Sequence, residues 1–144
     1  MTEVHEGGCV CGAIRYRVRG EPLNAYVCHC TFCQRFSGSA FGILTWFNEE
    51  NVEVEGDGIT THDHTVDETD RWFRLHFCSR CGTTFMANAQ RQPGIRFIMA
   101  GTYDDPNWVE LKNQIWMRSA QQWVVMPDHL ERSEKGLQRE PPSA

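Results

Sequence analysis

The seven cysteines of this 144-residue chain fall into three clusters, and their spacing predicts two metal sites of different kinds. Cys9-x-Cys11 and Cys78-x-x-Cys81 have the same form, a pair of thiols followed directly by glycine. Two such half-sites supply the four thiolates of a tetrahedral structural zinc site. The glycines allow sharp turns that aim backbone N–H groups at the sulfurs. We expect this site to be structural, because no coordination position remains for a substrate.

The middle cluster, Cys28, Cys30 and Cys33, supplies only three thiols and predicts an open second site. A zinc ion with three protein ligands keeps a fourth position for a substrate, as catalytic zinc sites do. Because three thiolates make the ion electron-rich, we expect it to hold a soft ligand such as a substrate thiolate rather than to activate water. Cys28, Cys30 and Cys33 are therefore the candidate catalytic residues.

Three other interpretations of the middle cluster remain open. Cys30 and Cys33 form a C-x-x-C pair that could become a redox disulfide, although no βαβ pattern surrounds it. His29 or His76 could complete the coordination and make the site structural. The cluster could also bind no metal at all.

Arg35, Ser37 and Ser39 follow the middle cluster directly and form a candidate substrate-binding loop. The Arg35 guanidinium could hold a carboxylate through paired hydrogen bonds, and the hydroxyls could add further contacts. A plain surface turn explains the same residues equally well. His62 and His64 could bind metal, but two histidines in a polar stretch are more often solvated.

Composition and charge argue against nucleic-acid and membrane partners and favour a reducing compartment. The formal net charge of −5 argues against nucleic acid, whose phosphates require clustered Lys and Arg. No apolar stretch approaches the length of a membrane span, and the first residues do not resemble a signal peptide. We therefore expect a cytoplasmic protein without membrane partners. In a reducing compartment, closely spaced and odd-numbered cysteines favour metal over disulfides.

The elements that must position these cysteines are strands, because hydrophobic residues mostly alternate with polar ones. Strands are predicted over 14–18, 39–47, 52–55, 72–78, 95–100 and 114–117, and one short helical turn over 30–36. The fold class is therefore a small all-β single domain over residues 1–130, followed by a polar, flexible tail over 131–144. We expect the five tryptophans to lie in the core, with one or two lining a pocket: Trp46, Trp72, Trp108, Trp116 and Trp123.

Three motifs in order resemble the glutathione-dependent formaldehyde-activating enzyme family, which includes centromere protein V. They are Gly8-Cys9-x-Cys11-Gly12-Ala13, then Cys28-His29-Cys30-x-x-Cys33-Gln34-Arg35-x-Ser37-Gly38-Ser39, then Phe77-Cys78-x-x-Cys81-Gly82-Thr83. The similarity runs from about Gly7 to about Leu130.

The resemblance implies a β-tent fold and two zinc ions, one on each cysteine set. It also implies a carbon–sulfur lyase that condenses glutathione with formaldehyde to S-hydroxymethylglutathione. Two functions from different classes follow. One is a zinc-dependent lyase that acts on a small thiol, such as glutathione, or on its aldehyde adduct. The other is a non-catalytic, zinc-stabilised binding module. An open middle cluster favours the first, and a fourth protein ligand favours the second.

Overall fold

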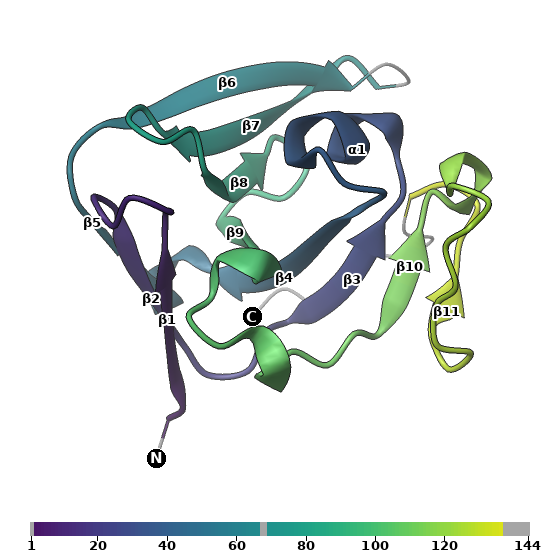
Figure 1. Ribbon diagram of the computed structural model, residues 1–144, viewed down its shortest axis with the longest axis horizontal. Helices are drawn as coiled ribbons and strands as arrows, with labels where there is room; N and C mark the ends of the chain where they lie inside the picture. Colours follow the sequence, from purple (N-terminus) through teal and green to yellow (C-terminus); the bar gives the residue numbers. More distant parts are fainter. Residues whose placement is uncertain (1, 67–68, 137–144) are drawn as a thin grey trace.

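The computed structural model describes residues 2–66 and 69–136 and contains two sheets (Figure 1). The small sheet has the order β1-β2-β5 and the large sheet the order β11-β10-β3-β4-β9-β8-β7-β6. The small sheet consists of β1 (Val4–Gly8), β2 (Arg15–Arg19) and β5 (Val52–Glu55). The large sheet consists of β3 (Asn24–Cys28), β4 (Gly42–Asn48), β6 (Ile59–Val66), β7 (Arg71–Cys78), β8 (Thr84–Ala89), β9 (Ile95–Met99), β10 (Asn113–Ile115) and β11 (Glu131–Arg132).

Helical structure is confined to short segments between the strands. The single α-helix described, α1 (Thr31–Ser37), follows β3, and the 3-10 helices are η1 (Glu49–Asn51), η2 (Ala100–Thr102), η3 (Pro106–Trp108) and η4 (Met117–Ser119). The all-β prediction and the short helical turn over 30–36 are therefore confirmed. In the described part of the chain, no helix is both long and apolar enough to cross a membrane.

Alternation identified β2, β5 and β7, but five strands escaped prediction: β1, β3, β6, β8 and the two-residue β11. β3 and β8 are buried at nearly every central position, so no polar residue marks an outer face. β6 is polar almost throughout and exposed at its first five positions, so no apolar face marks it. β1 carries two glycines at its end and pairs with β2 along its whole length.

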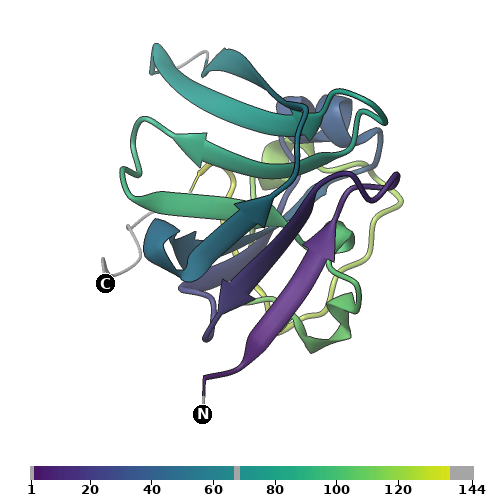
Figure 2. The ribbon, with the colours of Figure 1, turned by 90° about the vertical axis from the view of Figure 1, so that its left-hand side faces the viewer.

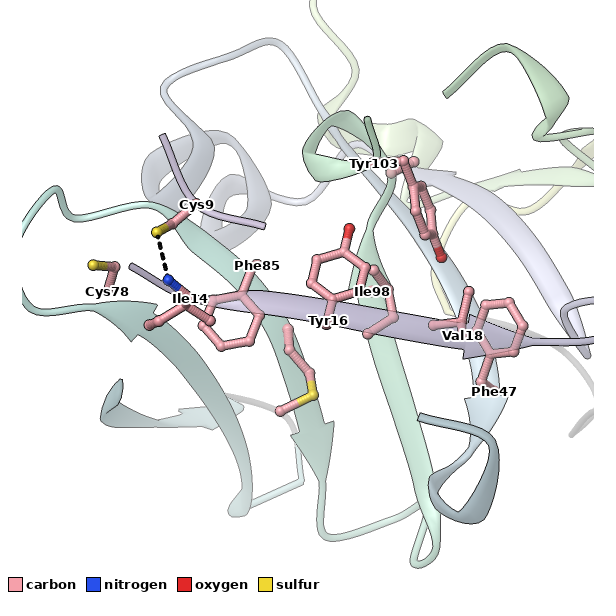
Figure 3. Close-up of a cluster of buried hydrophobic side chains, with 11 residues drawn as sticks. Cys9, Ile14, Tyr16, Val18, Phe47, Cys78, Phe85, Ile98 and Tyr103 are labelled. Atoms are coloured by element: carbon pink, nitrogen blue, oxygen red, sulfur yellow. Dashed lines mark hydrogen bonds between the residues drawn. The ribbon is translucent and has the colours of Figure 1, made fainter. Parts of the chain in front are cut away.

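The first core cluster fills the space between the two sheets. Ile14, Tyr16 and Val18 point from the small sheet toward Phe85 and other side chains of the large sheet (Figure 3). Figure 2 shows the molecule from the side of the small sheet, with β1 and β2 running at an angle to β6, β7 and β8 of the large sheet. Burial of these large side chains contributes roughly 1.5–3 kcal/mol each before entropy is counted. Cys9 and Cys78 belong to the same cluster, so this core holds one cysteine of each pair in the first cysteine set.

The second core cluster lies under the middle cysteine cluster. It packs Cys28 and Cys33 against Leu44, Tyr26 and Phe97, with the rings of Phe32 and Phe73 at its edge. Tyr26 and Phe97 both contact the Trp46 ring, at centroid distances of 5.8 and 5.0 Å. The middle cysteines are therefore held on a rigid apolar base.

Two expectations need correction. The flexible tail was expected from residue 131, but β11 pairs with β10 in parallel and the Trp116 N–H donates to the Lys135 carbonyl. The fold therefore continues to residue 136, while residues 137–144 of the expected tail lie outside the described residues. Trp46 is buried as expected, but Trp123 is 71% exposed and does not belong to the core. The other three tryptophans are half-buried.

Candidate metal centres and the adjoining cavity

The first cysteine set comes from two loops that are distant in sequence. Cys9 and Cys11 lie in the turn between β1 and β2, while Cys78 and Cys81 lie at the turn between β7 and β8. All four Sγ atoms lie within 4.8 Å of one another. The two loops meet because the small sheet packs on the large one, so this set joins both sheets.

The geometry of the first set fits a tetrahedral zinc ion. Cys9 Sγ lies 3.6 Å from Cys11 Sγ, which lies 3.7 Å from Cys78 Sγ. Bonds of about 2.3 Å from zinc to four sulfurs would separate those sulfurs by about 3.8 Å. No disulfide competes, because all seven cysteines are free.

Backbone donors surround the same sulfurs. The Ile14 N–H donates to Cys9 Sγ at 3.3 Å (Figure 3), and the Arg80 N–H donates to Cys78 Sγ at 3.4 Å. Gly12 and Gly82 adopt left-handed φ angles of 79° and 78°, which turn both loops back toward the thiols. These donors stabilise thiolates, as the surroundings of a metal site require.

One exposed thiol of the first set is already acidic. The Thr83 hydroxyl lies 3.2 Å from Cys81 Sγ, and this contact, with backbone N–H groups of Thr83 and Cys11, lowers the pKa of Cys81 to about 5. Cys81 and Cys11 are exposed, whereas Cys9 and Cys78 are buried. The set therefore lies at the surface edge of the core, where a metal ion can enter without the sheets opening.

The middle cluster is formed by the end of β3 and the start of α1. Cys28 is the last residue of β3, Cys30 is the N-cap of α1, and Cys33 lies inside the helix. The Cys33 N–H donates to Cys30 Sγ at 3.3 Å, which is the usual role of an N-cap side chain. Cys28 Sγ lies 3.3 Å from Cys30 Sγ, and all three sulfurs lie within 4.8 Å of one another. The three thiols therefore converge on one point.

The three thiols of the middle cluster differ in pKa. Hydrogen bonds from the Cys28 and Cys33 thiols, together with backbone N–H groups, lower the pKa of Cys30 to about 3. The same contacts raise the pKa of Cys28 and Cys33 well above the ordinary value, because each thiol would lose its proton beside an existing thiolate. A thiolate is thus present at neutral pH, and binding of a divalent ion would release the remaining protons.

No fourth side chain completes the middle cluster within the described residues. Among His, Cys, Asp and Glu there, only the three cysteines gather at this point. His29 is fully buried, and its Nε2 lies 3.1 Å from Gln114 Oε1. His76 Nε2 lies 2.7 Å from Asn88 Oδ1. Neither His29 nor His76 gathers with the three sulfurs, so the cluster is open on one side.

β4 approaches the open cluster closely because its first residue is glycine. A Cβ atom at Gly42 would lie 3.3 Å from Cys33 Cβ and 3.4 Å from Cys33 Sγ. This is tighter than most contacts of a real Cβ atom. The absence of a side chain at Gly42 therefore leaves room for the Cys33 sulfur in its present position.

A cavity of about 690 Å³ adjoins the middle cluster, and all three of its cysteines line it. This volume falls in the range of about 300–1,000 Å³ that small-molecule sites occupy. The remaining lining comes from β3, α1, β4, β6, β7, β10 and the segment after β10: Tyr26, Thr31, Phe32, Arg35, Leu44, His62, His64, Val66, Phe73, Ile115, Trp116, Arg118 and Ser119.

The structure brings only part of the predicted substrate loop to this cavity. Arg35 lines it, whereas Ser37 and Ser39 line a separate cavity of about 390 Å³ beside Gly82 and Thr83. Ser37 is the last residue of α1, and its hydroxyl donates to the Cys33 carbonyl, four residues earlier in the same helix, at 2.6 Å. In this geometry Ser37 supports the helix that carries Cys33.

The structure brings to the cavity two histidines for which the sequence favours a solvated position. His62 and His64 lie on β6 and both line the cavity. Their spacing of two residues places them on one face of a strand, which was the available signal. That β6 covers α1 depends on the β6–β7 hairpin, which the sequence pattern did not reveal.

Comparisons with known proteins agree with this geometry. The profile of the family described as glutathione-dependent formaldehyde-activating enzyme matches residues 4–119. A curated protein of Halomonas elongata, provisionally named a glutathione-dependent formaldehyde-activating enzyme, is 25% identical over 134 residues, covering 76% of this chain and 82% of its own length.

A solved structure has the same fold. The crystal structure of a Rhodobacter sphaeroides protein superposes with a TM-score of 0.56 at 23% identity, covering 74% of this chain and 96% of its own. At that identity the likeness bears on the fold alone. The family profile extends over both cysteine sets. The chain therefore belongs to the glutathione-dependent formaldehyde-activating enzyme family.

Proposed function

We propose that this protein is a zinc-dependent carbon–sulfur lyase that joins a small thiol to an aldehyde, or separates the two. The observation that carries the proposal is the group of three cysteines, with no fourth protein ligand among the described residues, that opens into a cavity of about 690 Å³. The family description supports glutathione as the thiol. Seven free cysteines fit a reducing compartment such as the cytoplasm.

The two cysteine sets have different roles in this proposal. Cys9, Cys11, Cys78 and Cys81 hold a structural ion that joins the two sheets, and Cys28, Cys30 and Cys33 hold a second ion. Bound at the second set, zinc supplies an exchangeable position for a soft sulfur ligand, because the other three positions are thiolates.

The reaction needs little from the chain beyond positioning. A thiolate sulfur adds to the aldehyde carbon, the electron pair of the C=O bond moves to oxygen, and that oxygen takes up the proton that the thiol lost. The cleavage direction reverses each step. The half-buried rings of Phe32, Phe73 and Trp116 exclude water from one side of the reacting atoms, which also slows hydration of the aldehyde.

Arg35 is the predicted substrate contact that the proposal retains. Its side chain is exposed and lines the cavity, and no hydrogen bond or ion pair joins it to another residue that the structure describes. An unpaired guanidinium there can bind a carboxylate of the thiol at some distance from the sulfur. Ser37 and Ser39 line the other cavity and are not assigned a role in catalysis.

Exchange NMR between glutathione, formaldehyde and their adduct tests this function. The zinc-loaded protein should accelerate exchange above the buffer rate, and Cys30→Ser should abolish the acceleration. This variant suits the test because serine is a good N-cap and preserves α1. Equal exchange rates in buffer, wild type and variant, with both proteins folded, would contradict the lyase and leave the non-catalytic binding module as the explanation of the family fold.

A further inference from the structure

The residues that line the cavity beside the middle cluster are apolar at its floor and charged at its rim. Its floor is apolar and buried, with Leu44, Tyr26 and Ile115 exposed by 1, 5 and 7%. Its walls are half-buried rings. Its rim carries the exposed cations Arg35 and Arg118. A ligand that fills this cavity must therefore combine an apolar group with an anionic group.

The Arg35 guanidinium has no acidic partner among the residues that the structure describes. Among the described residues that line the cavity there is neither Asp nor Glu, although the whole chain has 19 acidic and 14 basic residues. His62 and His64 add imidazole nitrogens to the same rim. This local reversal of charge favours an anionic ligand over a neutral or cationic one.

The ring walls are held in place before any ligand binds. The Phe32 ring stacks on His64 at 4.0 Å and meets Phe73 edge-on at 5.7 Å. Phe73 in turn stacks on Phe97 of the core at 5.5 Å. A wall fixed in this way can accept a flat apolar group with little further loss of entropy.

Trp116 adds another ring to the wall, and its backbone is strained. Its φ angle of 59° lies in the left-handed region, which is unfavourable for a bulky residue. Its ring also carries the Arg118 guanidinium at 4.8 Å. Strained residues of this kind concentrate at ligand sites, and this one lines the cavity.

We infer that the aldehyde partner of this site is aromatic or bulky and apolar rather than formaldehyde, and that it joins an anionic thiol. This inference rests on the proposed lyase function. The hydroxymethyl group from formaldehyde would leave the rings of Phe32, Phe73 and Trp116 against water. An aromatic hemithioacetal would cover them, while carboxylates of the thiol part reach Arg35. The atom balance is that of the formaldehyde reaction, with an aryl or alkyl group in place of one hydrogen of the aldehyde.

Two stable thioethers test this by binding alone. S-benzylglutathione and S-methylglutathione replace the hemithioacetal by a bond that cannot be cleaved, and they differ only in the group on sulfur. Calorimetry with zinc-loaded wild type should give at least about tenfold tighter binding of the benzyl compound, because its ring is buried against the wall. Equal affinities, or tighter binding of the methyl compound, would overturn the inference.

Matched variants locate the preference on the ring wall. Phe32→Leu removes the ring but keeps an apolar side chain in α1, and should reduce the preference at least about threefold. Phe41→Leu is the control, since Phe41 lines the other cavity and its ring meets His29 rather than Phe32. It should retain the wild-type preference. An equal loss in both variants would contradict a specific contact at Phe32.

A charge variant tests the anionic end. Arg35→Gln should weaken both compounds by a similar factor and leave the benzyl preference intact. Arg17→Gln on the small sheet should change neither affinity, because Arg17 is paired with Glu6 there. Unchanged affinities in Arg35→Gln would contradict the assignment of the anion to this rim.

Activity then separates this inference from the proposed function. If glutathione exchange is accelerated with formaldehyde but no faster with benzaldehyde, and the benzyl compound has no advantage, the inference fails while the lyase stands. If the benzyl compound binds tighter but no thiol–aldehyde pair is accelerated, the lyase fails and so does the assignment of an aldehyde. The zinc-loaded wild type is the protein used in both cases.

Discussion

The His64 imidazole lies parallel to the Phe32 ring, with centroids 4.0 Å apart and an interplanar angle of 7°. Phe32 sits between Cys30 and Cys33 in α1, while His64 lies on β6, the edge strand of the large sheet. This stack therefore ties the β6–β7 hairpin to the helix that carries the middle cysteines. Figure 1 shows the ribbons of β6, β7 and α1 in the same part of the molecule.

His64→Ala should weaken that tie. Loss of the ring contact should lower the free energy of unfolding by about 0.5–1.5 kcal/mol, the usual contribution of an aromatic pair. His62→Ala is the matched control, because His62 is exposed and makes no ring contact with another described residue. It should change stability by less than about 0.5 kcal/mol. Urea melts of the zinc-loaded proteins measure both, and equal losses would show that the stack contributes nothing.

Gly42→Ala should disturb the second metal site through a contact between β4 and Cys33. The added Cβ would press on Cys33 Cβ and Sγ and force the thiol to move. We expect zinc affinity at the middle cluster to fall on the order of tenfold, as for changes in the surroundings of metal ligands. Gly101→Ala is the control, because its Cβ would meet nothing within 4 Å. Chelator competition measures the affinities, and an unchanged value for Gly42→Ala would contradict the close approach of β4.

Cys81→Ser should show that the first metal site is structural. Because this set joins the loops after β1 and β7, losing a ligand should cost several kcal/mol of a margin of only about 5–15 kcal/mol. The exposed Cys81 side chain makes little packing, so the metal-free variant should match metal-free wild type. A zinc-loaded variant that melts within error of zinc-loaded wild type would argue against the structural assignment.

Metal release should proceed in two phases. The middle cluster offers three thiols and the first set four, so its ion should leave first under a mild chelator. The fast phase should be absent in Cys30→Ser, and the slow phase should remain. Stopped-flow measurements with a chromogenic chelator follow both. Release of both ions at one slow rate would indicate that another side chain closes the middle cluster.

The cysteine sets could be predicted from sequence because their information is local. Spacing alone groups Cys28, Cys30 and Cys33, and the shared pattern with glycine pairs Cys9 and Cys11 with Cys78 and Cys81. The structure gathers both sets as expected. Strands with one polar face, such as β7, were predictable for the same reason.

The cavity could not be predicted, because its walls come from tertiary contacts. His64 reaches Phe32 only through the β6–β7 hairpin, whose outer strand has almost no apolar face. Ser37 looked like a ligand residue by position, yet its hydroxyl bonds to the Cys33 carbonyl. Trp123 lies in the segment after η4 and is exposed, although its residue type favours burial.

The most direct test of the central claim is a thiol titration of the cobalt-substituted protein. Sulfur coordination to cobalt produces a charge-transfer band, and an open three-thiolate site should accept a fourth sulfur. Adding glutathione should intensify the band in wild type and leave it unchanged in Cys28→Ser, while Arg35→Ala should require more glutathione for the same band. A wild-type spectrum that no small thiol perturbs at millimolar concentration, with the fold intact, would contradict an open site that binds substrate through sulfur.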